Sequence, residues 1–383
     1  MTSALVVGGG PAGSALAIKL ATAGRDVVLL ERDRAASDKV CGEFLSREAG
    51  LYIAALGIDL AKLGAVPVDS VSLCASGQSR PGVSVSLPFA ATSLSRRVLD
   101  EALLERAESA GVSVKRGVLV REISKTKRGW CARTADETSI DADAVFLATG
   151  KHDIRSHKRG AGFQSDLVAF KMHWRLTQSE HSAIERRVEL ILFDGGYAGL
   201  QPIENDRANL CLVVRRERLR ALGQRWEGLL AAIRIESPHL DARLAGAEAC
   251  WPKPLALSAI PYGHLRWRSD GLWRLGDQAA VIPSFSGDGI SIALHSAEVA
   301  AATFLRDGAN AADRYQKRLA RDVALQLALA TTVSQALVRR SGQTLLSGAA
   351  RMWPALASTL AFHTRVPERA LNGAGLAASR CGV

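Results

Sequence analysis

The stretch Ala-Leu-Val-Val-Gly-Gly-Gly-Pro-Ala-Gly at residues 4–13 decides the fold of this 383-residue chain. Its four apolar residues predict a short buried strand. The glycine-rich loop then opens an alanine-rich helix that ends before Gly24, a typical helix-terminating residue. A second strand is predicted over residues 26–31, where Val27 to Leu30 are continuously apolar. Because such a run is typical of a parallel strand covered on both faces, the sequence predicts a β-α-β unit.

The loop has the spacing Gly-x-Gly-x-x-Gly, which indicates dinucleotide binding when it joins a strand to a helix. Gly8 permits the tight turn, Gly10 lets the backbone approach a pyrophosphate, and Gly13 lets the helix pack closely on the sheet. The helix amino terminus presents free N–H groups and a positive dipole end to the phosphates. The cofactor-binding residues predicted here are Gly8, Gly10, Pro11, Ala12 and Gly13.

Glu31 ends the second strand, where a carboxylate can accept hydrogen bonds from both ribose hydroxyls. The same carboxylate would repel a 2′-phosphate, so this site does not suit NADP. Arg32 and Val118 are predicted to belong to the same cofactor site.

A second glycine-rich segment follows a predicted strand at residues 272–275 and leads into a long helix. A nicotinamide dehydrogenase has no need of a second loop this far from the first, whereas FAD is long enough to use both. Asp277 can accept a hydrogen bond from a ribityl hydroxyl, and the helix that begins at Gly289 can face the pyrimidine edge of the flavin. The cofactor-binding residues predicted in this segment are Asp277, Pro283, Gly287, Gly289 and Ile290.

Two further elements are assigned to the cofactor. Arg96 stands at the head of a helix and either reaches the pyrophosphate or is a solvated arginine at a helix start. Thr149 and Gly150 close a strand, where small residues let the backbone pass near the cofactor.

In order and spacing, these elements resemble the para-hydroxybenzoate hydroxylase-like flavoproteins, and most of all their geranylgeranyl reductase and flavin-dependent dehydrogenase branch. Residues 39–46, Lys-Val-Cys-Gly-Glu-Phe-Leu-Ser, resemble the K-x-C-G-x-x-x-S segment of that branch. The resemblance implies that Cys41, Gly42 and Glu43 border the flavin or the substrate pocket, which makes Cys41 and Glu43 the catalytic candidates. The alternative for Cys41 is a packed, inert thiol.

The chain departs from these relatives after the strand that ends at Leu147. Thr149-Gly150, followed by a basic segment, replaces the Asp-Gly that is usual in the hydroxylases of this superfamily, which argues against direct use of NAD(P)H as the electron donor. The W-x-W-x-I-P signature of flavin-dependent halogenases is absent, and residues 197–202 stand in its place. Halogenation is therefore not expected.

The predicted function is that of an FAD-dependent oxidoreductase, with NAD(P)H as a candidate electron donor. The favoured reaction is oxidation or hydroxylation of an apolar aromatic or polyketide-like molecule by a monooxygenase-type enzyme. The alternatives are reduction of an isoprenoid C=C bond and a dehydrogenase with a protein electron partner. The residues predicted to line the substrate pocket are Trp174, Tyr197 and Pro202. For Trp174 and Tyr197 the alternative is a place in the core.

The expected fold class is α/β, with a Rossmann-like FAD-binding domain, an inserted β-rich substrate domain and a helical carboxy-terminal region. The FAD-binding domain is predicted at residues 1–65, 95–160 and 262–310. The substrate domain is predicted at 66–94 and 161–261, and the helical region at 311–383.

Composition and charge argue against several other classes of protein. The six cysteines have no zinc-like spacing, so neither a metal nor a disulfide framework is expected. No stretch reaches about 20 apolar residues, and we expect a cytoplasmic protein. The net charge of +11 comes without a nucleic-acid recognition motif, so nucleic acid is not expected as a partner. The arginine-rich tail from Arg339 either caps the substrate domain, which we favour, or contacts a membrane surface.

Overall fold

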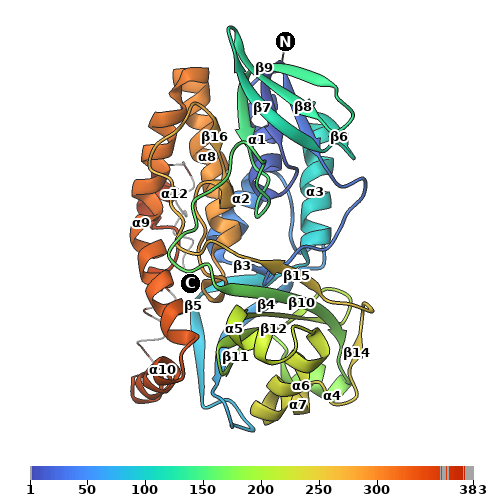
Figure 1. Ribbon diagram of the computed structural model, residues 1–383, viewed down its shortest axis with the longest axis vertical. Coiled ribbons are helices and arrows are strands. Elements are labelled where there is room, and N and C mark those ends of the chain that lie inside the picture. The colour runs from blue at the N-terminus through green and yellow to red at the C-terminus, as the bar shows by residue number, and fades with distance from the viewer. Residues whose placement is uncertain (1, 354, 356–358, 360–361, 374, 376–383) are drawn as a thin grey trace.

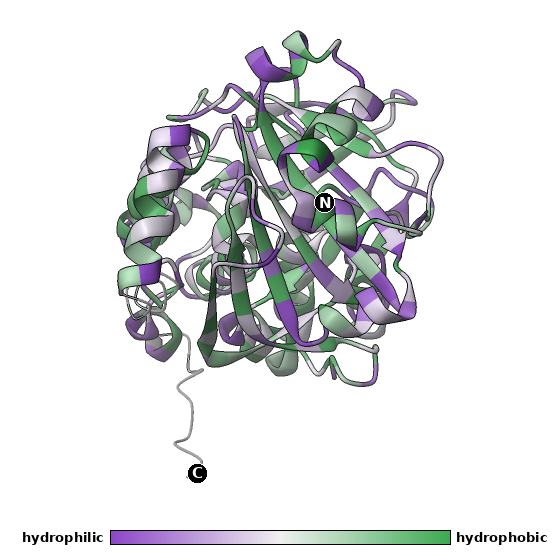
Figure 2. Cartoon of the chain, turned by 90° about the horizontal axis from the view of Figure 1, so that it is seen from below, coloured by the Kyte–Doolittle hydropathy of each residue, from purple (hydrophilic) through white to green (hydrophobic). Residues whose placement is uncertain are grey.

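The computed structural model describes residues 2–353, 355, 359, 362–373 and 375. It contains two sheets stacked along the long axis of the molecule, with long helices beside both (Figure 1). Hydrophobic segments run along the strands in the interior, and the surrounding loops are largely hydrophilic (Figure 2). The predicted α/β class is confirmed.

The first sheet is built on the predicted β-α-β unit. Strand β1 pairs in parallel with β2 on one side and with β9 on the other, with Ala4 opposite both Val27 and Ala144. The strands in sheet order are β6 (Ser113–Arg116), β2 (Val27–Glu31), β1 (Thr2–Val7), β9 (Ser139–Leu147), β8 (Gly129–Thr134) and β7 (Val120–Thr126), and β16 (Trp273–Arg274) also pairs with β9.

Helices cover one face of this sheet and share a single apolar core with it. Helix α1 (Pro11–Thr22) contacts both α3 (Arg96–Ser109) and α8 (Gly289–Asp307), and α2 (Arg47–Ala55) packs on α8. The side chain of Ser95 caps α3 by accepting a hydrogen bond from the Val98 amide. The amino termini of α1 and α8 are thereby held near the ends of the central strands.

The second sheet carries helices on one face and leaves the other to a cavity. Helices α5 (Arg216–Ala221), α6 (Trp226–Glu236) and α7 (Pro238–Arg243) contribute to the apolar core on the helical face. Helix α4 (Gln178–Ala183) precedes β11. The strands in sheet order are β14 (Glu248–Ala249), β10 (Leu167–Arg175), β13 (Arg207–Arg215), β12 (Gly196–Ile203), β11 (Arg187–Phe193), β4 (Val66–Cys74), β5 (Val83–Ser93) and β3 (Phe44–Leu45), and β15 (Leu255–Ser258) also pairs with β10.

The position of strand β3 differs from the predicted domain division. It pairs with β5 in the second sheet, although its residues fall within the predicted FAD-binding segment 1–65. The predicted domain boundaries otherwise stay predictions.

The carboxy-terminal helices connect both sheets (Figure 1). Helix α9 (Ala312–Leu337) packs Tyr315 and Leu319 into the first core and Leu337 into an apolar cluster on the second sheet. On α10 (Arg340–Met352), Gln343 Nε2 donates to the carbonyl of Phe193 at 2.8 Å. Helix α10 therefore caps the second sheet, as we favoured from the sequence. A short helix, α12 (Glu368–Gly373), follows.

Among the described residues, no helix is both long enough and apolar enough to cross a membrane.

Candidate cofactor and substrate site

The turn between β1 and α1 requires glycine at two positions. Gly8 has a φ of +110°, and a Cβ there would overlap the carbonyl oxygen of Ala148. A Cβ at Gly13 would overlap the carbonyl oxygen of Gly8. The helix can therefore approach the strand this closely only when both residues lack a side chain.

An outer cavity of about 390 Å³ lies beside this turn. Glu31 lines it and accepts hydrogen bonds from the backbone amides of Gly9 at 2.7 Å and Asp33 at 2.9 Å. On the same wall, Arg32 Nη2 lies 3.0 Å from Nε2 of His152. Of the residues predicted to bind the cofactor, the outer cavity brings together Gly8, Gly10, Glu31, Arg32, Arg96, Val118, Thr149, Gly150 and Asp277.

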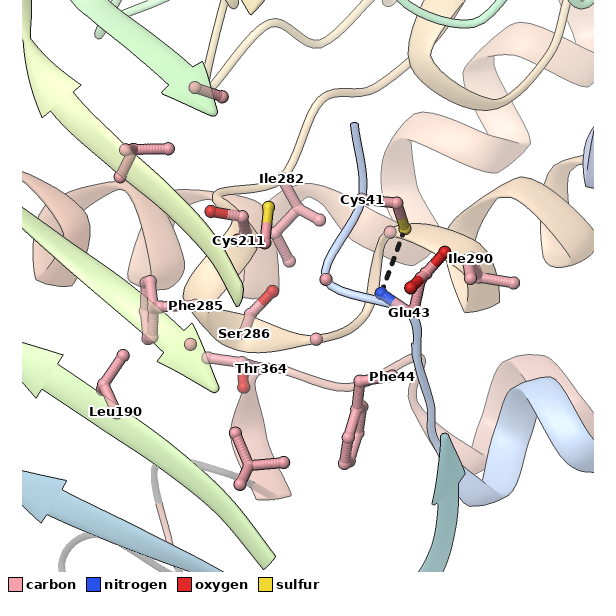
Figure 3. A pocket seen from close by; sticks show the side chains of 18 of the residues that line it. Cys41, Glu43, Phe44, Leu190, Cys211, Ile282, Phe285, Ser286, Ile290 and Thr364 are labelled. Carbon is pink, nitrogen blue, oxygen red and sulfur yellow. Dashed lines mark hydrogen bonds between the residues drawn. The ribbon is translucent and has the colours of Figure 1, made fainter. Parts of the chain in front are cut away.

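An inner cavity of about 380 Å³ lies between the first sheet, the second sheet and the carboxy-terminal helices (Figure 3). The two cavities adjoin, because both are lined by the same residues, namely Gly10, Val40, Arg96, Ala148, Gly150, Lys151 and Asp277. A long ligand can therefore extend from one cavity into the other.

Two cationic side chains lie where the cavities meet. Arg96 donates to both carboxylate oxygens of Asp100 at 2.8 Å, and Lys151 Nζ donates to Asp277 at 2.9 Å. Burial raises the pKa of Asp277, but the attraction of Lys151 outweighs it and holds that pKa below its ordinary value. Asp277 is therefore an ionised hydrogen-bond acceptor at neutral pH.

The amino terminus of α8 forms part of the inner wall. Gly287, Gly289 and Ile290 line the cavity, and α8 begins at Gly289 with its positive dipole end toward this space. Pro283 lines neither cavity, although its neighbours Ile282 and Ser284 line the inner one, and its contact with the cofactor stays a prediction.

The segment Cys41-Gly42-Glu43 borders the inner cavity, as the family resemblance implied. The Cys41 sulfur accepts a hydrogen bond from the Glu43 amide at 3.3 Å (Figure 3). Asn209 Nδ2 donates to the carbonyl oxygens of Cys41 at 3.2 Å and Gly42 at 2.9 Å. Because these bonds hold the backbone from the side of the second sheet, the segment has a fixed position against the cavity.

Glu43 is fully buried and has a φ of +61°, which is unusual for a residue with a side chain. Its carboxylate contacts Lys171 Nζ, lies 2.8 Å from His173 Nε2 and accepts from the Arg96 amide at 2.8 Å. Burial raises the pKa of Glu43, but Lys171 and His173 outweigh it and keep that pKa below its ordinary value. The carboxylate is therefore ionised and held by three partners from other segments.

A model of the family described as FAD binding domain matches residues 1–305. The chain belongs to the FAD binding domain family. It is an FAD-dependent oxidoreductase, and its predicted place among the para-hydroxybenzoate hydroxylase-like flavoproteins is confirmed.

Two curated relatives cover most of the chain. Digeranylgeranylglycerophospholipid reductase 2 of Methanosphaera stadtmanae is 26% identical over 332 residues, or 80% of this chain and 79% of that protein. Menaquinone reductase of Mycobacterium tuberculosis is 27% identical over 315 residues, or 78% of this chain and 75% of that protein. Among solved structures, the myxobacterial chondrochloren halogenase has a TM-score of 0.75 at 20% identity, over 95% of this chain and 90% of that one. This last likeness shows the fold alone.

The residues around both cavities fit FAD. Next to the inner cavity, a Cβ at Gly42, Gly150 or Gly289 would meet no atom within 4 Å, so the backbone leaves open space for a flat ring. Arg96 and Lys151 supply positive charge near the phosphate-binding turn. When bound there, FAD supplies two-electron redox chemistry.

The far end of the inner cavity is apolar. Its wall includes half-buried aliphatic side chains from three strands of the second sheet, namely Val71, Leu73, Val83, Val85, Val188 and Leu190. Tyr197 lines it as predicted, with its hydroxyl 3.2 Å from Ser284 Oγ and its ring edge-on to Phe285.

Trp174 and Pro202 do not line either cavity, and the same geometry explains both positions. Successive side chains of a strand point to opposite faces. On β10, Lys171 and His173 point toward Glu43, so Trp174 packs into the core on the helical face. On β12, Tyr197 and Gln201 line the cavity, so Pro202 lies on the opposite face.

Sequence reasoning missed the polar residues behind Cys41–Glu43. Lys171 and His173 alternate within the otherwise apolar strand Leu-Val-Ala-Phe-Lys-Met-His-Trp at residues 167–174. Fully buried polar residues need partners, so this alternation was the available signal. Lys151 stood in a basic cluster, but its pairing with Asp277 joins residues 126 positions apart.

Proposed function

We propose that this protein reduces C=C bonds in the isoprenoid chain of an apolar substrate. The observation that carries the proposal is the aliphatic wall of the inner cavity, which the Cys41–Glu43 segment also lines. Valine and leucine side chains give a surface without directional contacts, which suits a branched hydrocarbon chain.

The relatives support the same substrate class. Three relatives are named after compounds that carry an isoprenoid chain. They are digeranylgeranylglycerophospholipid reductase, menaquinone reductase and geranylgeranyl diphosphate reductase. From the sequence alone, this reaction was predicted only as an alternative to oxidation or hydroxylation. The cavity wall and these names now favour it over oxidation of an aromatic ring.

Reduction of a C=C bond adds a hydride and a proton, and the hydride would come from reduced FAD when it is bound. We assign the proton to the Cys41 thiol, because Cys41 lines the cavity on a segment that Asn209 holds in place. Glu43 has the role of a positioning residue, since Lys171 and His173 occupy its carboxylate.

A second candidate is the predicted monooxygenase reaction on an aromatic substrate. It is favoured by the aromatic side chains of Tyr197, Tyr262 and Phe285 in the same cavity. The electron donor is proposed to be NAD(P)H or a reduced partner protein.

The test is anaerobic. The FAD-loaded protein is reduced with dithionite, and a geranylgeranyl compound is added while the flavin absorbance is followed. The proposal expects the oxidised flavin spectrum to return without oxygen. Return only after oxygen is admitted, faster with an aromatic substrate present, would favour the monooxygenase reaction instead. Reduction of the flavin by NADH or NADPH in place of dithionite tests the donor.

A further inference from the structure

We propose that the outer face of α10, with the residue that follows it, docks onto an anionic lipid surface. This interfacial face is defined as Leu345, Met352 and Trp353 together with Arg339, Arg340 and Arg351. With the function proposed above, docking would also let an apolar substrate pass from the lipid surface into the inner cavity. This substrate passage rests on the proposed function, whereas the docking itself does not.

The first observation is the exposure of large apolar side chains. Leu345 is 72% exposed, Met352 65% and Trp353 62%. Leu345 and Met352 are seven residues apart, which is two helical turns, so they lie on the same side of α10. A cluster of large apolar side chains on one exposed face indicates an interaction site.

The opposite side of α10 belongs to the substrate cavity. Leu346 and Ala350 are one turn apart and line the inner cavity, and the neighbouring Gln343 is buried against the second sheet. The same helix is thus a wall of the cavity on its inner side and an exposed apolar surface on its outer side. Figure 1 shows α10 at the end of α9, beside the second sheet.

The positive charge around this face favours an anionic partner. Residues 338–353 contain three arginines and no acidic residue. Arg339, Arg340 and Arg351 are all exposed, and Arg340 also pairs with Asp194 at 3.0 Å. Basic residues beside exposed apolar ones complement an anionic bilayer, and tryptophan prefers the headgroup level.

A second copy of the chain fits this face less well. In a twofold dimer the same patch meets itself, so the arginines of the two copies would face one another. This like-charge contact disfavours self-association through α10.

The experiment is sedimentation of the full-length, FAD-loaded protein with vesicles of phosphatidylcholine alone or with 30% phosphatidylglycerol. We expect binding to the anionic vesicles and a loss of binding at high salt. Each basic residue near an anionic surface contributes about 1 kcal/mol, so Arg339→Gln combined with Arg351→Gln is expected to weaken binding roughly 30-fold. Leu345→Ser combined with Met352→Ser is also expected to weaken binding.

The matched control is Ile235→Ser, which changes an apolar residue of α6 that is 82% exposed and lies outside the interfacial face. It should bind vesicles like the unchanged protein. Equal binding by the interfacial variants, or no binding by the unchanged protein, would overturn the proposal. Sedimentation velocity that shows a dimer lost in Leu345→Ser would also overturn it, by assigning this face to a second copy. Because vesicle binding needs no turnover, its outcome is independent of the reductase assay.

Discussion

Replacement of Lys171 by methionine is predicted to destabilise the protein through Glu43. The ammonium of Lys171 contacts the Glu43 carboxylate, and both side chains are completely buried. Methionine has a similar length but no charge, so the variant removes the ammonium and leaves the buried carboxylate with only His173 and the Arg96 amide as partners. Loss of one partner of a buried ion pair costs about 3–5 kcal/mol of unfolding free energy, and we expect a loss in this range at pH 7.

The pH dependence of this loss has a definite sign. In the unchanged protein the pKa of Glu43 is held below its ordinary value of 4.5, so its contribution to stability is present above that pH and is lost as the pH falls further. Without Lys171, burial dominates and the pKa of Glu43 rises above that value. The Lys171→Met variant should then be least stable relative to the unchanged protein at neutral pH, and the difference should shrink toward pH 5.

Urea unfolding followed by circular dichroism measures both effects. The matched control is Lys171→Met combined with Glu43→Gln, which removes the unpaired charge and should recover a large part of the lost stability. A single variant within about 1 kcal/mol of the unchanged protein, or a double variant that recovers nothing, would refute the role given to this pair.

Three further predictions follow from single sites. Gly13→Val places a side chain against the carbonyl of Gly8, so the protein should purify without FAD, as its visible spectrum will show; a yellow variant would contradict the close approach. Cys41→Ser should retain FAD but slow alkene reduction at least tenfold, because a hydroxyl is a weaker acid than a thiol. The control is Cys211→Ser, which changes another cysteine of the same cavity and should alter the rate little. Equal rates for the two variants would contradict a catalytic role for Cys41. Burial raises the pKa of Asp288 from 3.8 to about 7, so the folded protein favours the protonated acid and loses stability as the pH rises between these values. Asp288→Asn should therefore reduce the fall of the melting temperature with pH in this range. An unchanged pH dependence of the melting temperature would contradict this role of Asp288.

The fold and the nucleotide end of the site could be predicted because their signals are local. The residues from Gly8 to Glu31 lie within one β-α-β unit, where the spacing of glycines and the position of one acid identify the site. Asp277 lies far along the chain, but it also follows a strand and precedes a helix. Local context was therefore sufficient to predict residues from both segments that line the two adjoining cavities.

The substrate end could not be predicted in the same way, because it depends on which face of a strand each side chain occupies. Trp174 and Pro202 were predicted to line the pocket, and the alternation of side chains along β10 and β12 places them on the opposite face. Two of the partners of Glu43, Lys171 and His173, come from β10, about 130 residues further along the chain. Only the folded chain brings these residues together.

The most direct test of the proposed reaction is the mass of the product. A geranylgeranyl compound is incubated anaerobically with the reduced, FAD-loaded protein, and the extract is analysed by mass spectrometry. Reduction predicts a gain of about 2 Da for each double bond, since one hydride and one proton are added. An unchanged mass without oxygen, together with a gain of about 16 Da on an aromatic substrate in air, would contradict the reductase assignment and establish oxygen insertion.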